Sequence, residues 1–375
     1  MVRVGEVHVN RRYRVAQALD IRWSDGRLVL DNLYRRRSVS VEPELAPKVL
    51  SLLQRLSDWT GMRELEQALA GWDRPTAVRT FARLVASGCV VASDDLVEGI
   101  GGRLEPWHGW GREAMTFHFG TRDYLYVESS QDNLAEFVGP GARPPLHKTH
   151  GDAERVGLPA PRELSEASLG DALLQRRTVR AFRPEPVSLD QFAQLLWLTW
   201  GQTAWIESEH FGRLVKKTSP SGGARHPIEV YPVVLNVSGL EPGVYHYAPL
   251  SNELELLARG DQSARLAESL SPQGWLVSAG AVFVMTAVFA RTMWKYGNAR
   301  AYRAILLEAG HLGQTFHLVA TALGLGPFTS IAFHDSRLES LLGVDGIDEA
   351  ALYLAAAGVP DPTEPTLQTG LSDAT

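Results

Sequence analysis

The chain has 375 residues, which is more than one ordinary domain needs, so two or three structural units are expected. Its 45% hydrophobic and 21% charged residues are typical of a folded, soluble protein and argue against a largely disordered one. A net charge of -6 provides no overall attraction to nucleic acid or membrane, and the single cysteine, Cys89, excludes an intramolecular disulfide framework. With no signal-peptide core and no apolar run of membrane-spanning length, the sequence predicts a cytoplasmic protein.

Residues 1–95 are predicted to form a first, winged-helix-like domain. Two strand-like stretches, 13–23 and 27–32, flank Ser24-Asp25-Gly26, and an Asp-Gly pair favours a tight hairpin. Apolar residues then recur at three- and four-residue spacing, which predicts three short helices, before an apolar run at 89–92.

Arginines dominate the first part of this domain, with eight arginines and three aspartates between Arg11 and Arg37. Such a cluster suits nucleic acid, but the third helix, near residues 74–86, offers no convincing set of base-reading side chains. An acidic peptide is therefore the better candidate partner, and nucleic acid is not expected.

Residues 96–168 are interrupted by glycines and prolines and are rich in aromatic side chains, among them Trp107, Trp110 and Phe119. We expect a connector that packs on its neighbours through these rings. The last residues, 363–375, are expected to form a flexible tail.

Residues 169–362 are predicted to form an α+β domain. Helices are indicated at 169–174, at 188–201, where Ser188 and Gln191 form a capping box, and at 299–323. Strands are indicated at 228–237, 244–247, 281–289 and 352–356. Antiparallel strands mixed with long helices favour a layered α+β architecture.

Three segments of this domain suit a flat, phosphorylated ligand. Arg176, Arg177, Thr178 and Arg180 resemble a phosphate clamp, although a solvated basic loop is also compatible with them. The small residues of 219–224 allow the backbone to approach a ligand closely, without the spacing of a nucleotide-triphosphate loop. Gly324-Leu325-Gly326 ends the longest helix with a similar element.

Lys295 and Tyr296 place an amine beside a phenol between a strand-like run and that helix. An adjacent ammonium favours the phenolate, so we expect a lowered pKa for Tyr296 and acid/base chemistry at this pair. Taken alone, the dipeptide is more typical of a solvated surface. His311 and His317 do not share a helix face and His246 lies in a strand, so no metal site is expected.

Together these motifs resemble the SagB-type dehydrogenases, a flavin-dependent branch of the nitroreductase fold that oxidises azolines in modified peptides. The resemblance covers about residues 169–360. It is carried by Arg176-Arg-Thr-Val-Arg-Ala-Phe182, Pro220-Ser-Gly-Gly-Ala224 with Pro227-Ile-Glu-Val-Tyr231, Gly239-Leu-Glu-Pro-Gly-Val-Tyr-His-Tyr247, Trp294-Lys-Tyr-Gly297 with Arg300-Ala-Tyr-Arg303, and Glu308-Ala-Gly-His311.

The resemblance implies an FMN cofactor at a homodimer interface and a nitroreductase-like sheet flanked by helices. It assigns Arg176, Arg177, Thr178 and Arg180 to the phosphate and ribityl chain, and Pro220, Ser221 and Gly222 to the isoalloxazine. Gly324, Leu325 and Gly326 would lie near its far side. Lys295 and Tyr296 would be the catalytic pair, with Tyr296 removing a ring proton while the flavin takes a hydride and oxygen later reoxidises it.

The substrate implied is a heterocycle-containing precursor peptide, or a peptide on a carrier protein, with a cyclodehydratase as a further partner. The first domain more weakly resembles leader-peptide-binding elements. Two departures are Gln314-Thr315, where relatives more often have Gln-Asn and little chemical effect is expected, and Ala224-Arg-His226, which leaves the substrate open. A general nitro- or quinone reductase using NAD(P)H, and a peptide-binding scaffold without catalysis, are the alternatives.

Overall fold

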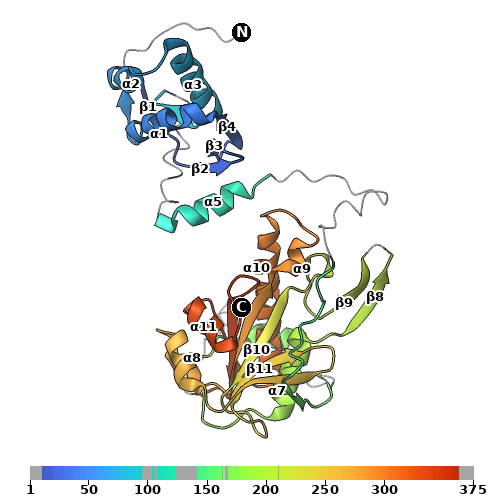
Figure 1. The fold of residues 1–375 in the computed structure, drawn as a ribbon. Helices are drawn as coiled ribbons and strands as arrows, with labels where there is room; N and C mark the ends of the chain where they lie inside the picture. Colours follow the sequence, from blue (N-terminus) through green and yellow to red (C-terminus); the bar gives the residue numbers. More distant parts are fainter. Residues whose placement is uncertain are drawn as a thin grey trace, which may run out of the picture. The chain divides into compact units, whose positions relative to one another are not determined.

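A computed structural model describes residues 11–94, 104, 107, 109–123, 142–162, 164, 168–209 and 211–362. The chain divides into two compact units, residues 1–126 and residues 127–375, whose elements are labelled in Figure 1. Each unit is considered by itself. In the described part of the chain, no helix is both long and apolar enough to cross a membrane.

Residues 11–94 of the first unit combine two small sheets with the helices α1, α2 and α3. One sheet has the order β5-β1-β6 and the other the order β2-β3-β4, all pairs antiparallel. Their elements follow the chain as β1 Arg12–Val15, β2 Leu19–Ser24, β3 Arg27–Asn32, β4 Arg37–Val41, α1 Ala46–Arg55, β5 Thr60–Gly61, α2 Met62–Leu69, α3 Arg74–Ser87 and β6 Val90–Ala92. The predicted hairpin and three helices are present, while the winged-helix assignment itself stays a prediction.

Local chemistry explains the ends of these elements. Asp25 and Gly26 both have positive φ, as a two-residue hairpin turn requires, and Ser24 pairs with Arg27 across it. Asp73 caps α3 by accepting a hydrogen bond from the Thr76 backbone, and the left-handed Gly88 ends that helix.

The arginines of this unit are largely engaged within it. Arg11, Arg22 and Arg27 form ion pairs with Asp94, Asp31 and Glu42, respectively. The basic charge that favoured an acidic peptide is therefore partly neutralised on the surface of the unit.

The aromatic connector expected at 96–168 is shared between the two units. Helix α5, Arg112–Gly120, belongs to the first unit, where Trp107, Met115 and Phe119 pack with Ala18. The later part contributes β7, Glu154–Gly157, to the sheet of the second unit. Tyr124, Tyr126 and the expected tail at 363–375 lie outside the described residues.

The second unit is built on a seven-stranded antiparallel sheet with the order β14-β15-β13-β10-β11-β12-β7. The strands other than β7 are β10 Ile228–Val234, β11 Gly243–Ala248, β12 Glu253–Arg259, β13 Ala281–Val288, β14 Gly326–Ser330 and β15 Glu349–Gly358. The central strands β10 and β13 are almost entirely buried on both faces, which explains why their residues are mostly apolar, apart from the buried Glu229 and Thr286.

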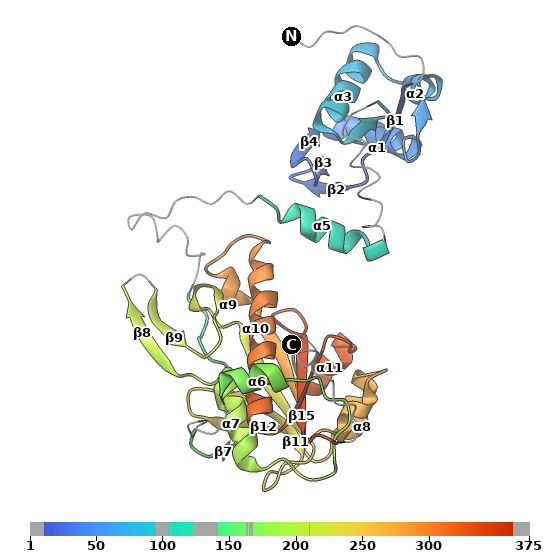
Figure 2. The same ribbon diagram turned by 180° about the vertical axis from the view of Figure 1, so that it is seen from behind.

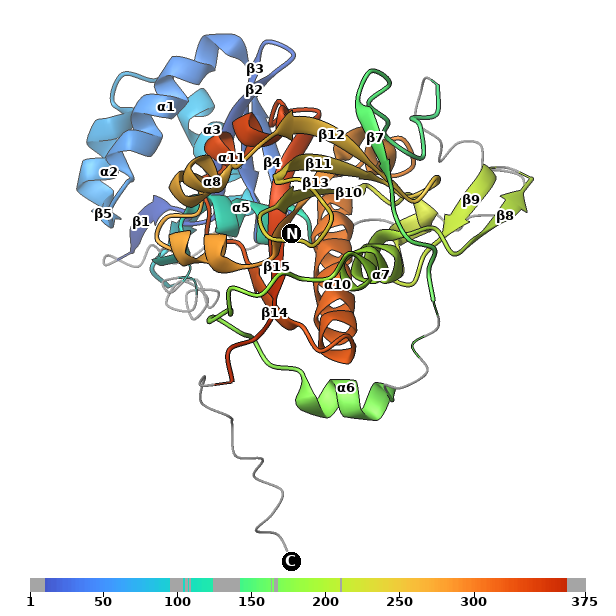
Figure 3. The same ribbon diagram turned by 90° about the horizontal axis from the view of Figure 1, so that it is seen from below.

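Helices cover both faces of this sheet (Figure 3). Helices α7, Leu189–Trp200, and α10, Ala301–Ala322, pack on one face, and α8, Ser263–Ser269, and α11, Asp335–Leu342, pack on the other. Helix α6, Leu169–Gln175, precedes the arginine segment, which is residues 176–180. Helix α9, Phe289–Met293, directly follows β13. The hairpin formed by β8, Ala204–Ser208, and β9, Gly212–Lys216, projects from the sheet layers (Figure 2).

An aromatic cluster fixes α7 and α10 to the sheet. The ring of Phe283 on β13 lies 5.6 Å from that of Phe192, 5.8 Å from that of Trp200 and 5.2 Å from that of Phe316. All four side chains are almost fully buried, so the cluster joins three elements of the second unit.

Replacing Phe283 with Ala should lower the free energy of unfolding of the second unit by about 3–5 kcal/mol, because the cavity borders both helices. Leu250→Ala, at a side chain that is 69% exposed, should change it by less than about 0.5 kcal/mol. Denaturant unfolding followed by tryptophan fluorescence measures both. Equal effects of the two substitutions would contradict this account of the core.

Candidate functional site

The loop that contains Pro220, Ser221 and Gly222 follows β9 and rests on α10. Its backbone reverses sharply, with φ of +62° at Gly223, +52° at Ala224 and +45° at His226. The Ser221 hydroxyl accepts a hydrogen bond from the His226 backbone at 2.8 Å, which closes the turn. Pro220 and Gly222 stay exposed, so the outer side of the loop is open to a ligand.

Helix α10 holds this loop at several successive turns. The Thr315 and Ser219 hydroxyls lie 2.6 Å apart, and His311 approaches the Pro220 carbonyl at 3.4 Å. Thr315 is the position where related sequences more often carry Asn, and the sequence predicts little effect of that change. The Thr315 hydroxyl helps to fix the start of the loop, and the effect of the change stays a prediction.

Lys295 and Tyr296 lie between α9 and α10, with both side chains over the same loop. A Cβ atom at Gly223 would overlap the Tyr296 hydroxyl and lie 2.8 Å from Lys295 Nζ. Both polar groups therefore lie close to Gly223. The structure brings together the amine, the phenol and the loop that the sequence had indicated separately.

The prediction that Lys295 lowers the pKa of Tyr296 was wrong. Burial raises the pKa of Tyr296, and the cation that opposes this rise is Arg225. Burial, reinforced by Arg225, also lowers the pKa of Lys295. The prediction was based only on the adjacency of the two residues in the sequence. Both side chains are half-buried, and burial disfavours the charged form of each.

Arg225 was noted in the sequence only as part of Ala224-Arg-His226, a departure from the family pattern near the substrate side, and its interaction with the Lys-Tyr pair was not predicted. Its side chain is buried, its Nε donates to the Gly223 carbonyl at 3.1 Å, and it lies 5.1 Å from the centre of the Trp294 ring. Phe211, from the tip of the β8–β9 hairpin, lies 4.2 Å from Lys295 Nζ. No spacing rule in the sequence relates these positions to the Lys-Tyr pair.

Tyr296 also borders a pocket of about 290 Å³. Most of its walls are apolar, and they are formed by Phe289, Thr292, Met293, Tyr296, Gly297, Asn298, Ala299, Ala301, Tyr302 and Ile305. A small planar group could therefore lie beside the phenol.

The arginine segment lies against β14. The Val179 backbone donates to the Pro327 carbonyl at 2.8 Å, and Gly326 leaves room for the Val179 side chain. This contact brings Arg176, Arg177, Thr178 and Arg180 to the strand that begins at Gly326, next to Gly324. Leu325 has its side chain buried in the core, so only its backbone can face a ligand.

The guanidiniums of this segment differ in their surroundings. Arg177 donates to the Leu174 and Arg176 carbonyls at 2.8 Å each, and Arg180 lies 5.8 Å from the centre of the Phe328 ring. Burial and the charge of Arg176 together lower the pKa of His317 on α10 to about 4. Neither Arg176 nor Arg177 forms an ion pair with a carboxylate among the described residues.

A buried acid lies behind the exposed loop. Glu308 of α10 is hydrogen-bonded to the Ser221 side chain, and its Oε1 lies 3.8 Å from His226 Nδ1. Burial raises the pKa of Glu308 to about 7, although Ser221, Lys217 and Arg291 lower it. Burial lowers the pKa of His226 to about 3, so His226 is neutral and its Nε2 donates to the Val215 carbonyl.

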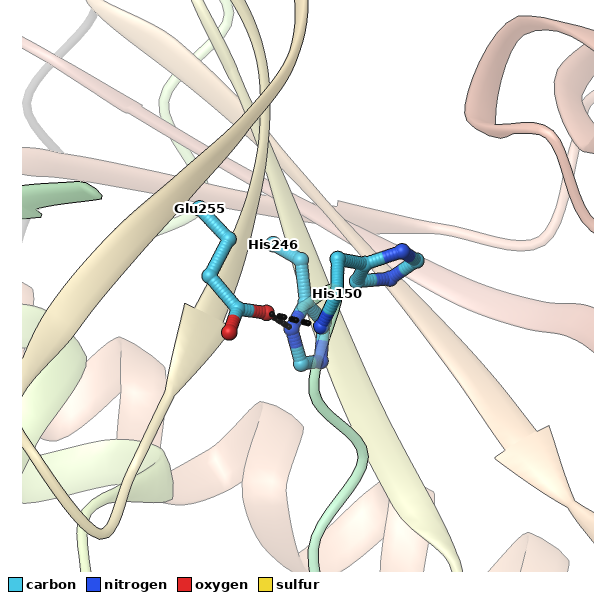
Figure 4. A group of neighbouring side chains, drawn as sticks. All are labelled: His150, His246 and Glu255. Carbon is cyan, nitrogen blue, oxygen red and sulfur yellow. Dashed lines mark hydrogen bonds and ion pairs between the residues drawn. The ribbon is translucent and has the colours of Figure 1, made fainter. Parts of the chain in front are cut away.

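His150, His246 and Glu255 form a group with the residue types of a metal site (Figure 4). Both ring nitrogens of His246 are already engaged, Nδ1 with Glu255 at 2.8 Å and Nε2 with Glu229 at 3.0 Å. Burial opposes protonation, but these carboxylates raise the pKa of His246. His150 donates a hydrogen bond to Glu255 through its backbone nitrogen at 3.0 Å, and a nitrogen of its ring lies within 4.8 Å of the other two ligand atoms. His246, Glu255 and Glu229 form a buried ion network.

Comparison with known proteins assigns this architecture to a family. The sequence pattern of the Nitroreductase family matches residues 173–359. The nitroreductase-like protein MJ1384 of Methanocaldococcus jannaschii is 32% identical over 194 residues, which cover 52% of this chain and 92% of that protein. The chain belongs to the nitroreductase family.

Two further similarities extend this assignment. The trifolitoxin-processing protein TfxB of Rhizobium leguminosarum bv. trifolii is 34% identical over 231 residues, covering 60% of this chain and 61% of TfxB. The crystal structure of a nitroreductase-like protein from Anabaena variabilis superposes with a TM-score of 0.51 at 25% identity. That superposition covers 67% of this chain and 48% of the Anabaena chain. The nitroreductase fold predicted from the sequence is thus confirmed.

In the nitroreductase domain, Gly223→Ala should destabilise the loop by about 1–2 kcal/mol, because alanine is strained at positive φ and its Cβ meets Tyr296 and Lys295. Gly297→Ala is the matched control, since a Cβ there meets nothing within 4 Å. Denaturant unfolding compares the two variants. Similar losses in both would show that Gly223 is not sterically restricted.

Glu308→Gln should alter the pH dependence of stability. Because burial raises the pKa of Glu308 from 4.5 to about 7, its contribution to stability is present below pH 4.5 and lost as the pH rises through 7. The wild-type protein should therefore lose on the order of 3 kcal/mol relative to the Glu308→Gln variant over this window. Unfolding measured from pH 4.5 to 8 tests this.

Glu268→Gln, at an exposed position, is the control for this comparison and should leave the pH dependence unchanged. If the Glu308→Gln variant and the wild-type protein run in parallel across the window, Glu308 does not titrate there.

Proposed function

We propose that this nitroreductase-family protein is an FMN-dependent dehydrogenase that oxidises thiazoline or oxazoline rings to azoles in a peptide natural-product pathway. The observation that carries the proposal is the position of Lys295 and Tyr296 directly over the Gly223 loop. An acid/base pair at that loop suits a reaction that removes a proton and a hydride from adjacent carbon atoms. Similarity to a trifolitoxin-processing protein supports a role in a biosynthetic pathway.

The residues of the chain are compatible with FMN. The guanidiniums of Arg176 and Arg177 lie at half-buried positions and have no carboxylate partner among the described residues, so they remain available to a phosphate. Pro220, Ser221 and Gly222 would hold the ring system, because the exposed, small-residue loop allows close approach. Bound FMN would supply hydride acceptance.

The pair would handle the proton. Burial lowers the pKa of Lys295 and raises that of Tyr296, and in this proposal the two groups act together as the base. Tyr296 would take the proton from the substrate carbon while its own proton passes to Lys295. The apolar pocket beside Tyr296 would hold the five-membered ring and exclude water.

We further propose that the protein acts as a homodimer, with one cofactor held between the two copies. The loop with the Lys-Tyr pair meets α10 near Ala304 and Glu308, whereas the arginine segment lies at β14 and His317. A second copy would bring the two groups together around one cofactor. Exposed apolar side chains on α6 and α10 are available to such an interface, and they are Leu169, Leu173, Leu174, Leu306 and Leu307.

The first unit is proposed to bind the precursor peptide. A groove of about 550 Å³ runs between the strands and α1 and combines Val15, Ile21 and Leu50 with Arg14. Ile21 and Trp23 of β2, at the edge of its sheet, are exposed to a partner. A cyclodehydratase would then deliver the heterocycle to the second unit.

The visible spectrum of the purified protein under anaerobic conditions tests the function. Addition of a thiazoline-containing peptide should bleach the band of bound FMN, whereas NADPH should not. Bleaching by NADPH alone would indicate a general nitro- or quinone reductase. Peptide binding without any bound flavin would indicate a scaffold.

Tyr296→Phe should retain FMN and reduce the rate of flavin reduction by the peptide by at least about 100-fold, because the proton acceptor is lost. Stopped-flow absorbance measures the rate, and the FMN-to-protein ratio is the control. Undiminished reduction in this variant would remove Tyr296 from the reaction.

A further inference from the structure

Arg225 is a buried cation without an anionic partner. Its side chain is only 3% exposed, and no carboxylate among the described residues forms an ion pair with it. Its Nη2 is buried and has no hydrogen-bond partner. A buried guanidinium in this condition is strongly unfavourable, so its retention requires a compensating interaction.

The surroundings fix the guanidinium in place. Nε donates to the Gly223 carbonyl at 3.1 Å, and the Trp294 ring lies 5.1 Å away. Arg143 lies 5.8 Å from the same indole, where it is held by the Arg213 carbonyl at 2.7 Å. Trp294 directly precedes the Lys-Tyr pair, so the arginine is tied to both the loop and the pair.

The group able to become an anion that faces Arg225 is Tyr296. The two interact electrostatically, and the interaction favours the charged form of each. Arg225 also disfavours an ammonium on Lys295. Other charged or titratable groups nearby include Arg143, which repels Arg225, Glu207, which interacts with Arg143, and Tyr302, which lines the same pocket as Tyr296.

We propose that Arg225 is a positioning residue whose buried guanidinium favours loss of the proton from the Lys295–Tyr296 pair and so sets its strength as a base. It acts on both members in the same direction, by stabilising a phenolate and destabilising an ammonium. The catalytic consequence of this assignment rests on the proposed function. The effect of Arg225 on the ionisation of Tyr296 and Lys295 is independent of that function.

Ultraviolet difference titration of the full-length, flavin-loaded protein tests this directly. The spectrum of the wild-type protein minus that of Tyr296→Phe reports the ionisation of Tyr296. The same difference between Arg225→Gln and the double variant Arg225→Gln/Tyr296→Phe reports it without the guanidinium. We expect the midpoint to rise by about one pH unit or more in the absence of Arg225.

Matched variants define the outcome. Arg143→Gln removes the other arginine beside Trp294 and should leave the Tyr296 midpoint in place. Arg225→Lys keeps the charge and should shift it less than Arg225→Gln. Should Arg225→Gln fail to fold, Arg225→Met removes the charge while preserving an apolar contact with the indole.

An unchanged midpoint in the charge-removing variants, or an equal shift in Arg143→Gln, would overturn the proposal. The acid limb of the pH–kcat profile for peptide oxidation reports the ammonium of Lys295, and it should move to higher pH in Arg225→Gln, with a loss of about tenfold at pH 7 and little change in KM. If the titration shifts but no variant oxidises azolines, Arg225 keeps its role and the proposed function fails. If azolines are oxidised and the Tyr296 midpoint does not shift, the proposed function stands and the role of Arg225 fails.

Discussion

The packing of α10 on the central sheet is the constraint on which the site depends. Ile305, Leu312 and Phe316 bury one side of this helix against β10 and β13, and the Phe283 cluster fixes its height. From this position the helix supports the small-residue loop through Glu308 and Thr315. The geometry of Lys295, Tyr296 and Gly223 therefore follows from a rigid element and does not depend on a free loop.

Buried charge provides a second layer of support. Arg291 pairs with Glu229 at 2.5 Å and donates to the carbonyls of His226 and Pro145. One guanidinium thus joins β10, the site loop and the segment that leads to β7. Removing one member of such a buried pair would leave an uncompensated charge, so the network specifies one arrangement of these segments.

The sequence predicted the local features of this chain well. The capping box of Ser188 and Gln191, the Asp25-Gly26 hairpin turn and the apolar run of β13 all occur as expected, because each depends on neighbouring residues. The arginine and small-residue motifs were recognisable for the same reason. The division of the aromatic connector between two units depends on contacts with distant elements, which local patterns do not specify.

By itself, the sequence determined which residues could carry the chemistry and that the chain resembles a nitroreductase. The tertiary structure decided how readily these residues ionise and which side chains surround them. Burial reverses the expected direction of the Tyr296 pKa, and Arg225 reaches the pair only because the left-handed loop folds back beneath it. The physical reason is that ionisation and steric fit depend on all atoms around a group, and most of those around Tyr296 come from segments far away in the chain.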